Sequence, residues 1–440
     1  MYPAILTPDS YEALRQVIAL DTSLYNSAVV TPSSIIFWKI FSINANFLFG
    51  IPLIQSFLIY LALFMWNSIL LPSKDKKTSF LITGLMYLTP FFGPLAVTIW
   101  KDVPYIAITM IGLAVLTKLK ANDKNLWSHF FLGGGLLAFG ATFRYEGFLV
   151  LLVGSILLFA CHYLYRKLFG ISVYLKFAFI FFVASIISIL LSSGFSKITH
   201  IDTPGNFYKT QSFFLDLEYV NSNFPETLPL GIKDVLQKIS IERNLVGIKS
   251  CTDTQNFYSS DFDLNYANDE AKNMPKYWLQ ALSSNAREAL IVSRICRSSS
   301  VLPLPLSYIP ESGYWPTTGM SPNLLRPERP FVIERFFYPV GWVWSKIWGI
   351  NGNLIAWPGL HFSIIIIFMI FRLQKRNLFR FGMGNVVMAI PIIFLIARSL
   401  ILFGTVASQE FRYFAHVYFI SIPLLIAFLL NNLRAPNRLG

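Results

Sequence analysis

The chain has 440 residues, of which 54% are hydrophobic and 13% are charged, and its mean hydropathy is +0.54. Soluble domains carry about 25% charged residues, so this composition excludes an ordinary soluble domain and predicts an all-α polytopic membrane protein. The net charge of +13 does not indicate a nucleic-acid partner, because the Lys and Arg residues lie mostly in short turns between apolar runs.

The first 50 residues contain no apolar run long enough to span a membrane. Asp9 precedes a helical pattern over residues 11–20, and Asp9 with Glu12 has the spacing of a capping box. A second, amphipathic run covers residues 33–41 and is expected to lie in the membrane interface. Residues 1–50 are therefore expected to form a loop with amphipathic helices outside the bilayer.

Nine apolar runs follow, and each is expected to form a membrane span. Six belong to an N-terminal module, residues 51–193, and three to a C-terminal module, residues 351–440. The expected spans are 51–71, 80–99, 103–118, 128–142, 147–165, 175–193, 354–371, 384–403 and 413–430.

A polar segment over residues 194–350 separates the sixth span from the seventh. It is long enough for a small folded domain or for loops that cover a substrate. Two of the three cysteines, Cys251 and Cys296, lie in it, while Cys161 lies in an apolar run. The two cysteines can pair, but two alone do not define a disulfide framework.

Basic residues are distributed unequally between the two sets of turns. One set, with its flanking residues, holds 15 of them: Lys74, Lys76, Lys77, Lys118, Lys120, Lys124, Arg166, Lys167, Lys176, Arg372, Lys375, Arg376, Arg380, Arg434 and Arg438. The short turns of the other set hold only Lys101, Arg144 and Arg412. The positive-inside rule makes the first set cytoplasmic, which predicts that the N-terminus and residues 194–350 are extracytoplasmic.

This topology brings a group of charged residues to the outer face: Asp9, Lys101, Asp102, Arg144, Glu146, Arg398, Glu410 and Arg412. A carboxylate can deprotonate an acceptor hydroxyl or hold a divalent cation such as Mg²⁺ or Mn²⁺. Arginines can clamp a phosphate bidentately. A phosphate at the membrane surface indicates a lipid-linked donor. The sequence contains no Cys/His cluster of the metal-binding kind.

Each of these residues also has a structural interpretation. Asp9 and Asp102 can cap helices, Arg144 and Glu146 can neutralise each other in a tight loop, and Arg398 can reach the outer headgroups from within its span. Two further interpretations concern the interface: Lys101 as a headgroup contact, and Glu410 with Arg412 as anchors of the last span.

Four short motifs in this order resemble the GT-C superfamily of polytopic glycosyltransferases. The stretch from Tyr2 to Ser10 is similar to the Pro…Asp-Ser start of that class's first external loop. Trp100-Lys-Asp-Val-Pro-Tyr105 is similar to its acidic motif at the start of a later span. Phe143-Arg-Tyr-Glu-Gly147 and Phe411-Arg-Tyr-Phe414 are similar to its arginine motifs. The resemblance covers residues 1–200 and 384–430.

The resemblance implies an inverting transfer of a sugar from a polyprenyl-phosphate donor to a lipid, glycan or protein acceptor outside an inner or plasma membrane. It implies that Asp9 is the base and that Asp102 orients the acceptor or helps to bind a cation. The substrate-binding residues that it implies are Lys101, Arg144, Glu146, Arg398, Glu410, Arg412 and Tyr413. The class has a span before its first loop, and we expect that span to be missing from this reading frame.

Two other functions remain open from the sequence. A lipid or solute transporter or flippase would use broken helices, for which Gly133-Gly-Gly135 and Pro90 to Pro94 are candidates. A non-catalytic, degenerate member of the GT-C superfamily would retain the helical architecture without the activity. Under the transferase interpretation, Tyr308, Tyr314 and Trp315 of the polar segment are expected to stack on sugar rings or to pack beneath that segment.

Overall fold

The computed structural model describes several stretches of the chain, and within them the protein is all-α. The described stretches are residues 31–41, 50–71, 76–89, 91–118, 126–169, 173–199, 206–239, 251, 262–298, 358–374, 383–405 and 411–433. They contain 16 α-helices and two 3-10 helices. In chain order these are α2 (Pro32–Phe41), α3 (Gly50–Leu70), α4 (Lys76–Tyr87), α5 (Gly93–Val97), α6 (Asp102–Thr117), α7 (Leu126–Ala141), α8 (Gly147–Phe169), α9 (Val173–Thr199), α10 (Asn206–Asn223), η2 (Pro225–Thr227), α11 (Leu230–Ile239), α12 (Leu264–Glu270), α13 (Met274–Leu282), α14 (Arg287–Arg297), α16 (Pro358–Gln374), α17 (Met383–Thr405), η5 (Phe411–Val417) and α18 (Tyr418–Leu433).

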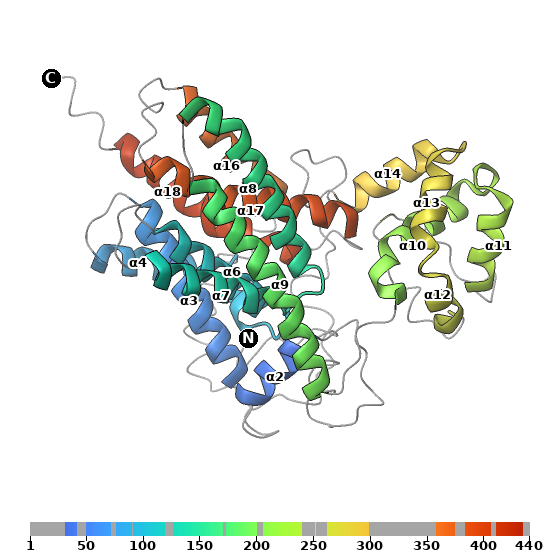
Figure 1. Ribbon diagram of the computed structural model, residues 1–440, viewed down its shortest axis with the longest axis horizontal. Helices are drawn as coiled ribbons and strands as arrows, with labels where there is room; N and C mark the ends of the chain where they lie inside the picture. The colour runs from blue at the N-terminus through green and yellow to red at the C-terminus, as the bar shows by residue number, and fades with distance from the viewer. Residues whose placement is uncertain are drawn as a thin grey trace, which may run out of the picture.

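Helix α6 forms the centre of the main bundle (Figure 1). All of its 16 residues are buried, and it packs against α3, α7, α17 and η5. A helix that is apolar on every side is expected in the interior of a bundle. Side chains from the helices between α2 and α9 and from α16 to α18 complete the same hydrophobic core.

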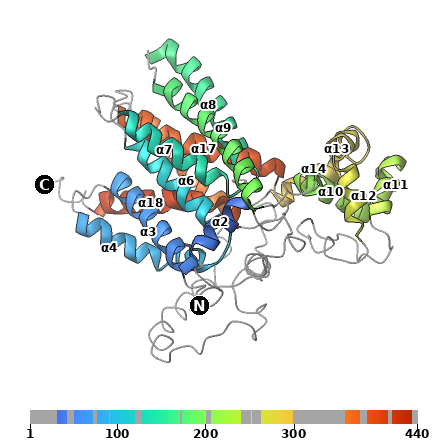
Figure 2. The same ribbon diagram turned by 60° about the horizontal axis from the view of Figure 1, so that its bottom comes forward.

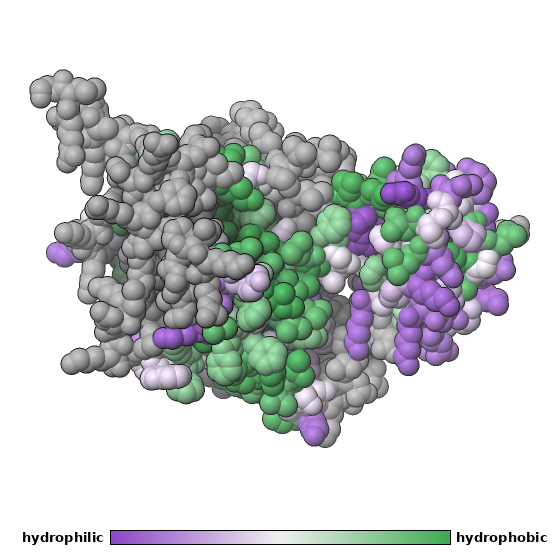
Figure 3. Space-filling model, turned by 45° about the horizontal axis from the view of Figure 1, so that its top comes forward, coloured by the Kyte–Doolittle hydropathy of each residue, from purple (hydrophilic) through white to green (hydrophobic). Residues whose placement is uncertain are grey.

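The outer surface of the bundle carries many large exposed hydrophobic side chains. They include Phe80 and Leu85 on α4, Phe159 on α8, and Phe179 and Leu190 on α9. Figure 3 shows this hydrophobic surface over the bundle and hydrophilic side chains gathered on the unit formed by α10 to α14. An apolar surface of this extent is typical of a protein whose helices face lipid rather than water.

Three described helices are long and apolar enough to cross a membrane: Gly50–Leu70, Gly147–Leu164 and Tyr174–Thr199. They correspond to the expected spans 51–71, 147–165 and 175–193. Shorter apolar helices cover Asp102–Thr117, Pro358–Phe368, Ala389–Thr405 and Phe414–Leu429, which overlap four further expected spans. The expected span 128–142 overlaps α7.

The prediction of one continuous span over residues 80–99 is wrong. The chain forms α4, which ends at Tyr87, and then the short helix α5, which begins at Gly93. Pro90 lies in this interval and Pro94 in the first turn of α5, and proline cannot supply the N–H that a continuing helix needs. The 33–41 run does form a helix, α2, and most of its residues are buried against α3 and α9.

Helices α10 to α14 form a second unit with a core of their own. Figures 1 and 2 show it beside the bundle, near the C-terminal end of α17. Phe207, Phe214 and Leu217 of α10 are fully buried in this core, together with Leu290 of α14. A disulfide joins Cys251 to Cys296, with the two Cα atoms 6.1 Å apart.

The second unit holds the last carbonyl groups of α17. Ser212 Oγ donates to the carbonyl of Gly404 at 3.0 Å, and Ser298 Oγ donates to that of Phe403 at 3.1 Å. Arg294 Nη1 donates to both carbonyls at 3.4 Å. The last carbonyls of a helix have no partner within the helix, so these bonds satisfy them and fix the unit to this end of α17.

Candidate functional site

A tight turn between α7 and α8 positions Arg144 and Glu146. The backbone N–H of Gly147 donates to the Arg144 carbonyl at 3.0 Å and closes the turn. A Cβ atom at Gly147 would clash with the carbonyl oxygen of Ala141. Only glycine therefore fits the first position of α8, and the two charged side chains are presented at the end of the bundle where α7 ends and α8 begins.

Four charged side chains from three separate parts of the chain form one line of ion pairs. Arg144 Nη1 lies 2.5 Å from Asp102 Oδ1, and its Nε and Nη2 atoms donate to Glu146 Oε1 at 2.8 and 2.7 Å. Arg398 Nη1 donates to the same Glu146 oxygen at 3.1 Å. We call Asp102, Arg144, Glu146 and Arg398 the charged cluster.

The charged cluster is largely buried. The Arg398 side chain has 0% exposure and that of Asp102 has 4%, while those of Arg144 and Glu146 retain 12% and 14%. Isolated charges in such surroundings would cost several kcal/mol each, so mutual neutralisation is a condition for folding. Burial alone would raise the pKa of the Glu146 carboxyl, but the Arg144 and Arg398 guanidinium groups outweigh it and hold that pKa below its ordinary value.

The first turn of α6 supplies both a charge and an aromatic ring to this region. Asp102 is the first residue of α6 and Lys101 is its N-cap, so Asp102 lies where a helix favours negative charge. The Arg398 guanidinium stacks over the Tyr105 ring, 5.0 Å from its centroid. Lys101 Nζ lies 5.7 Å from the centroid of the Tyr145 ring. Such cation–π contacts stabilise each cation without an added carboxylate.

The structure thus brings together five of the residues that the sequence singled out, namely Lys101 and the four members of the charged cluster. Arg398 lies within the bundle and pairs with Glu146, so it does not reach the headgroups as the structural interpretation supposed. Asp9 and Glu410 lie outside the described residues, as do Tyr308, Tyr314, Trp315 and the side chains of Arg412 and Tyr413.

The described residues do not suit a divalent cation. No group of three or more His, Cys, Asp or Glu side chains comes together in the described stretches. Asp102 and Glu146 both accept hydrogen bonds from guanidinium groups, and these positive charges would repel a cation.

Sequence reasoning missed three uncharged members of this region, Tyr105, Thr109 and His416. Thr109 Oγ1 lies 3.1 Å from His416 Nε2, and the Tyr105 and His416 rings have centroids 4.9 Å apart. One signal was present: Tyr105 and Thr109 lie three and seven residues after Asp102, which places all three on one face of α6. Nothing in the sequence pattern linked His416 to that face.

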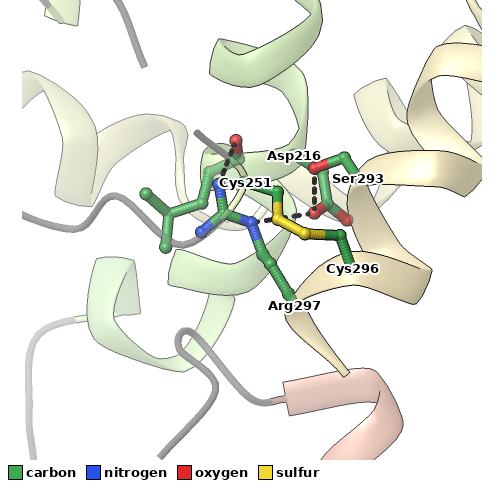
Figure 4. The surroundings of a disulfide bond; sticks show 6 residues. Asp216, Cys251, Ser293, Cys296 and Arg297 are labelled. Carbon is green, nitrogen blue, oxygen red and sulfur yellow. Dashed lines mark hydrogen bonds and ion pairs between the residues drawn. A yellow bond between two sulfur atoms is a disulfide. The ribbon is translucent and has the colours of Figure 1, made fainter. Parts of the chain in front are cut away.

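A second group of buried charges lies in the α10–α14 unit. Asp216 has 0% exposure and pairs with Arg294 and Arg297. Trp278 Nε1 and Ser293 Oγ each donate to it at 3.0 Å. Figure 4 shows Asp216, Ser293 and Arg297 beside the disulfide. Because the carboxylate is fully satisfied by groups of α13 and α14, this group has a structural role: it holds α10 to α14 at the end of α17.

Comparison with protein-family models, curated proteins and solved structures finds no match to this chain.

The buried pairing predicts a specific pattern of stability. We expect Arg398→Gln to cost about 3–5 kcal/mol, because it removes one partner of a buried ion pair. In a Glu146→Gln background the same substitution should cost at least about 1 kcal/mol less, because the carboxylate has already gone. The measurement is the unfolding midpoint of the four purified proteins in detergent.

The matched control is Arg398→Gln in an Asp269→Asn background. Asp269 is exposed on α12, so the two effects should add. Additive effects in the Glu146→Gln background as well would contradict the pairing.

Proposed function

We propose that the protein is a membrane glycosyltransferase of the GT-C type, which moves a sugar from a lipid-phosphate-linked donor to an acceptor on the extracytoplasmic face. The observation that carries the proposal is the charged cluster at one end of an apolar bundle. Two arginines and two carboxylates are held there by four helix ends and the α7–α8 turn. The eight other expected spans and an extracytoplasmic segment over residues 194–350 belong to the same proposal.

The direction of the helices supports a single site at a single face. Asp102 begins α6 and Gly147 begins α8, whereas Arg398 lies in the last turns of α17. Arg398 is six residues from Gly404, which corresponds to about 9 Å along a helix. The charged cluster therefore lies within two turns of α17 from the hydrogen bonds by which the α10–α14 unit holds that helix.

The disulfide supports an extracytoplasmic position for that unit. Disulfides form and persist in oxidising compartments and are rare in the cytosol. Cys251 and Cys296 lie in the α10–α14 unit. The distribution of basic residues also favours an extracytoplasmic position for residues 194–350, which include this unit. Two independent arguments thus agree on the orientation.

The chemistry assigned to the cluster follows from its groups. Arg144 and Arg398 offer planar guanidinium groups, which suit the phosphate of the donor and stabilise the negative charge that develops as the sugar leaves. Asp102, with Asp9, supplies carboxylates that orient the acceptor or take its hydroxyl proton. The donor's lipid chain would lie along the exposed hydrophobic surface of the bundle. Glu410, Arg412 and Tyr413 remain assigned to substrate binding by resemblance alone.

A transporter or flippase is the second candidate, and buried polar groups in the bundle favour it. His361 Nδ1 lies 2.8 Å from Ser421 Oγ between α16 and α18, and both residues are buried. Pro391 lies inside α17 and Pro423 inside α18. Buried polar groups inside a membrane bundle are typical of transport pathways. Substrate cleavage separates the two functions, because a flippase leaves its lipid intact.

We expect Asp102→Asn to lower sugar transfer by at least about a hundredfold, because the amide keeps the shape of the carboxylate but cannot accept a proton. Asp9→Asn should act in the same direction. Transfer is measured with purified protein, radiolabelled polyprenyl-phosphate sugars and a membrane-lipid acceptor fraction. Asp269→Asn is the control and should retain full activity. Wild-type rates for both Asp9→Asn and Asp102→Asn would show that the carboxylates take no part.

The orientation predicts different accessibility for two exposed positions. In a Cys161→Ser background, Gln237→Cys on α11 should react with a membrane-impermeant maleimide in intact cells. Ser128→Cys, at the opposite end of α7 from the α7–α8 turn, should react only after permeabilisation. The reverse pattern would place the charged cluster at the cytoplasmic face.

A further inference from the structure

Two buried polar atoms next to the charged cluster have no hydrogen-bond partner in the described structure. They are the hydroxyl of Tyr105 and Nδ1 of His416. Their residues have 1% and 0% exposure, and their rings meet edge to face with centroids 4.9 Å apart. Nearly all buried polar side-chain atoms in proteins are satisfied, so two adjoining exceptions require a physical explanation.

The hydrogen bonds around Thr109 define the state of His416. Thr109 Oγ1 donates its single hydrogen to the carbonyl of Tyr105 at 2.6 Å. In its 3.1 Å contact with His416 Nε2 the hydroxyl can therefore only accept, so Nε2 carries the hydrogen. In a neutral imidazole the other nitrogen then has a bare lone pair. Nδ1 is thus an acceptor, and the Tyr105 hydroxyl has a hydrogen to donate.

Arg398 connects these two atoms to the charged cluster. Its guanidinium group stacks on the Tyr105 ring and donates to Glu146. This positive charge also opposes a second one on the imidazole, which favours hydrogen-bond acceptance at Nδ1 over protonation. The Phe394 ring, with its centroid 5.6 Å from that of His416, packs beside the imidazole.

The backbone that carries His416 is suited to local movement. His416 lies in η5, a seven-residue 3-10 helix with a non-helical residue, Phe414, before α18 begins at Tyr418. The two short 3-10 turns of η5 meet at a kink at Phe414, two residues before His416. A small rotation at this kink is the movement that would open Nδ1 to a ligand.

We propose that Tyr105 and His416 form a hydroxyl-binding pair that recognises the sugar of the lipid-linked donor. The inference rests on the proposed function and names the part of the donor that Tyr105 and His416 would select. A sugar hydroxyl accepts the hydrogen of the Tyr105 hydroxyl and donates its own to His416 Nδ1, so both unsatisfied atoms gain partners. The donor's phosphate lies at the same time against Arg398 and Arg144. Neither residue takes part in bond breaking, so both are positioning residues.

The test compares a lipid phosphate with and without an esterified sugar. Farnesyl phosphate alone is the first probe, and farnesyl phosphate esterified to mannose, glucose or N-acetylglucosamine is the second. Apparent Kd values are measured by isothermal titration of the purified protein in detergent. Wild type should bind at least one sugar-bearing probe more tightly than farnesyl phosphate. Tyr105→Phe and His416→Gln should each weaken that probe about tenfold and leave farnesyl phosphate unchanged.

The variants are chosen to keep the packing. Tyr105→Phe retains the ring beneath Arg398. His416→Gln places an amide N–H where Nε2 donates to Thr109 but removes the Nδ1 acceptor. His416→Asn, by contrast, places an acceptor near the Nδ1 position and should restore part of the lost affinity. The ligand-free Tyr105→Phe protein should unfold at the same temperature as wild type or higher, since it loses only an unpaired hydroxyl.

Each other outcome overturns the pair as a sugar site. A lower unfolding temperature for ligand-free Tyr105→Phe would show that the hydroxyl binds an internal water. Equal weakening of both probes would show a purely structural role. Tight binding of farnesyl phosphate with no gain from any sugar would overturn the inference but leave the proposed function intact. If wild type binds neither probe, the lipid-phosphate donor itself is wrong and both proposals fall.

Discussion

The ion pairs of Glu146 with Arg144 and Arg398 are the constraint on which the rest of the site depends. Charges can enter an apolar bundle only if they neutralise one another, and here the partners are 2 and 252 residues apart in the chain. Their pairing fixes the α7–α8 turn against α17, and Arg144 then fixes that turn against the first residue of α6 through Asp102. These ion pairs fix the ends of α6, α7, α8 and α17 relative to one another, and the apolar side chains around α6 pack within that arrangement.

The α10–α14 unit extends the same arrangement beyond the bundle. Asp216 gathers Arg294 and Arg297, and Arg294 also donates to the last carbonyls of α17. A displacement of this unit would therefore move the end of α17, and Arg398 lies less than two turns away. An acceptor that binds to the unit and a donor that binds at the charged cluster would meet at this junction. This arrangement is one that a transferase needs and that a simple lipid channel does not.

Much of the fold could be predicted from the sequence, because long apolar runs have only one stable conformation in a membrane. This logic holds for α3, α8 and α9. It failed over residues 80–99, where the apolar run predicts one span but the chain breaks between α4 and α5, near Pro90 and Pro94. The proximity of Asp102, Arg144, Glu146 and Arg398 was expected from topology alone. The pairing within that group was not, since no sequence pattern tells a charge that faces a headgroup from one that faces another helix.

The hydroxyl-binding pair was beyond sequence reasoning for a related reason. His416 is one of 5 scattered histidines, and it meets Tyr105 only because η5 packs against α6. The most direct test of the whole account is to follow a doubly labelled polyprenyl-phosphate sugar through the purified wild-type protein in proteoliposomes. The account predicts release of one polyprenyl phosphate for each sugar transferred, with inversion at the anomeric carbon. Movement of the intact donor across the bilayer without cleavage would contradict it.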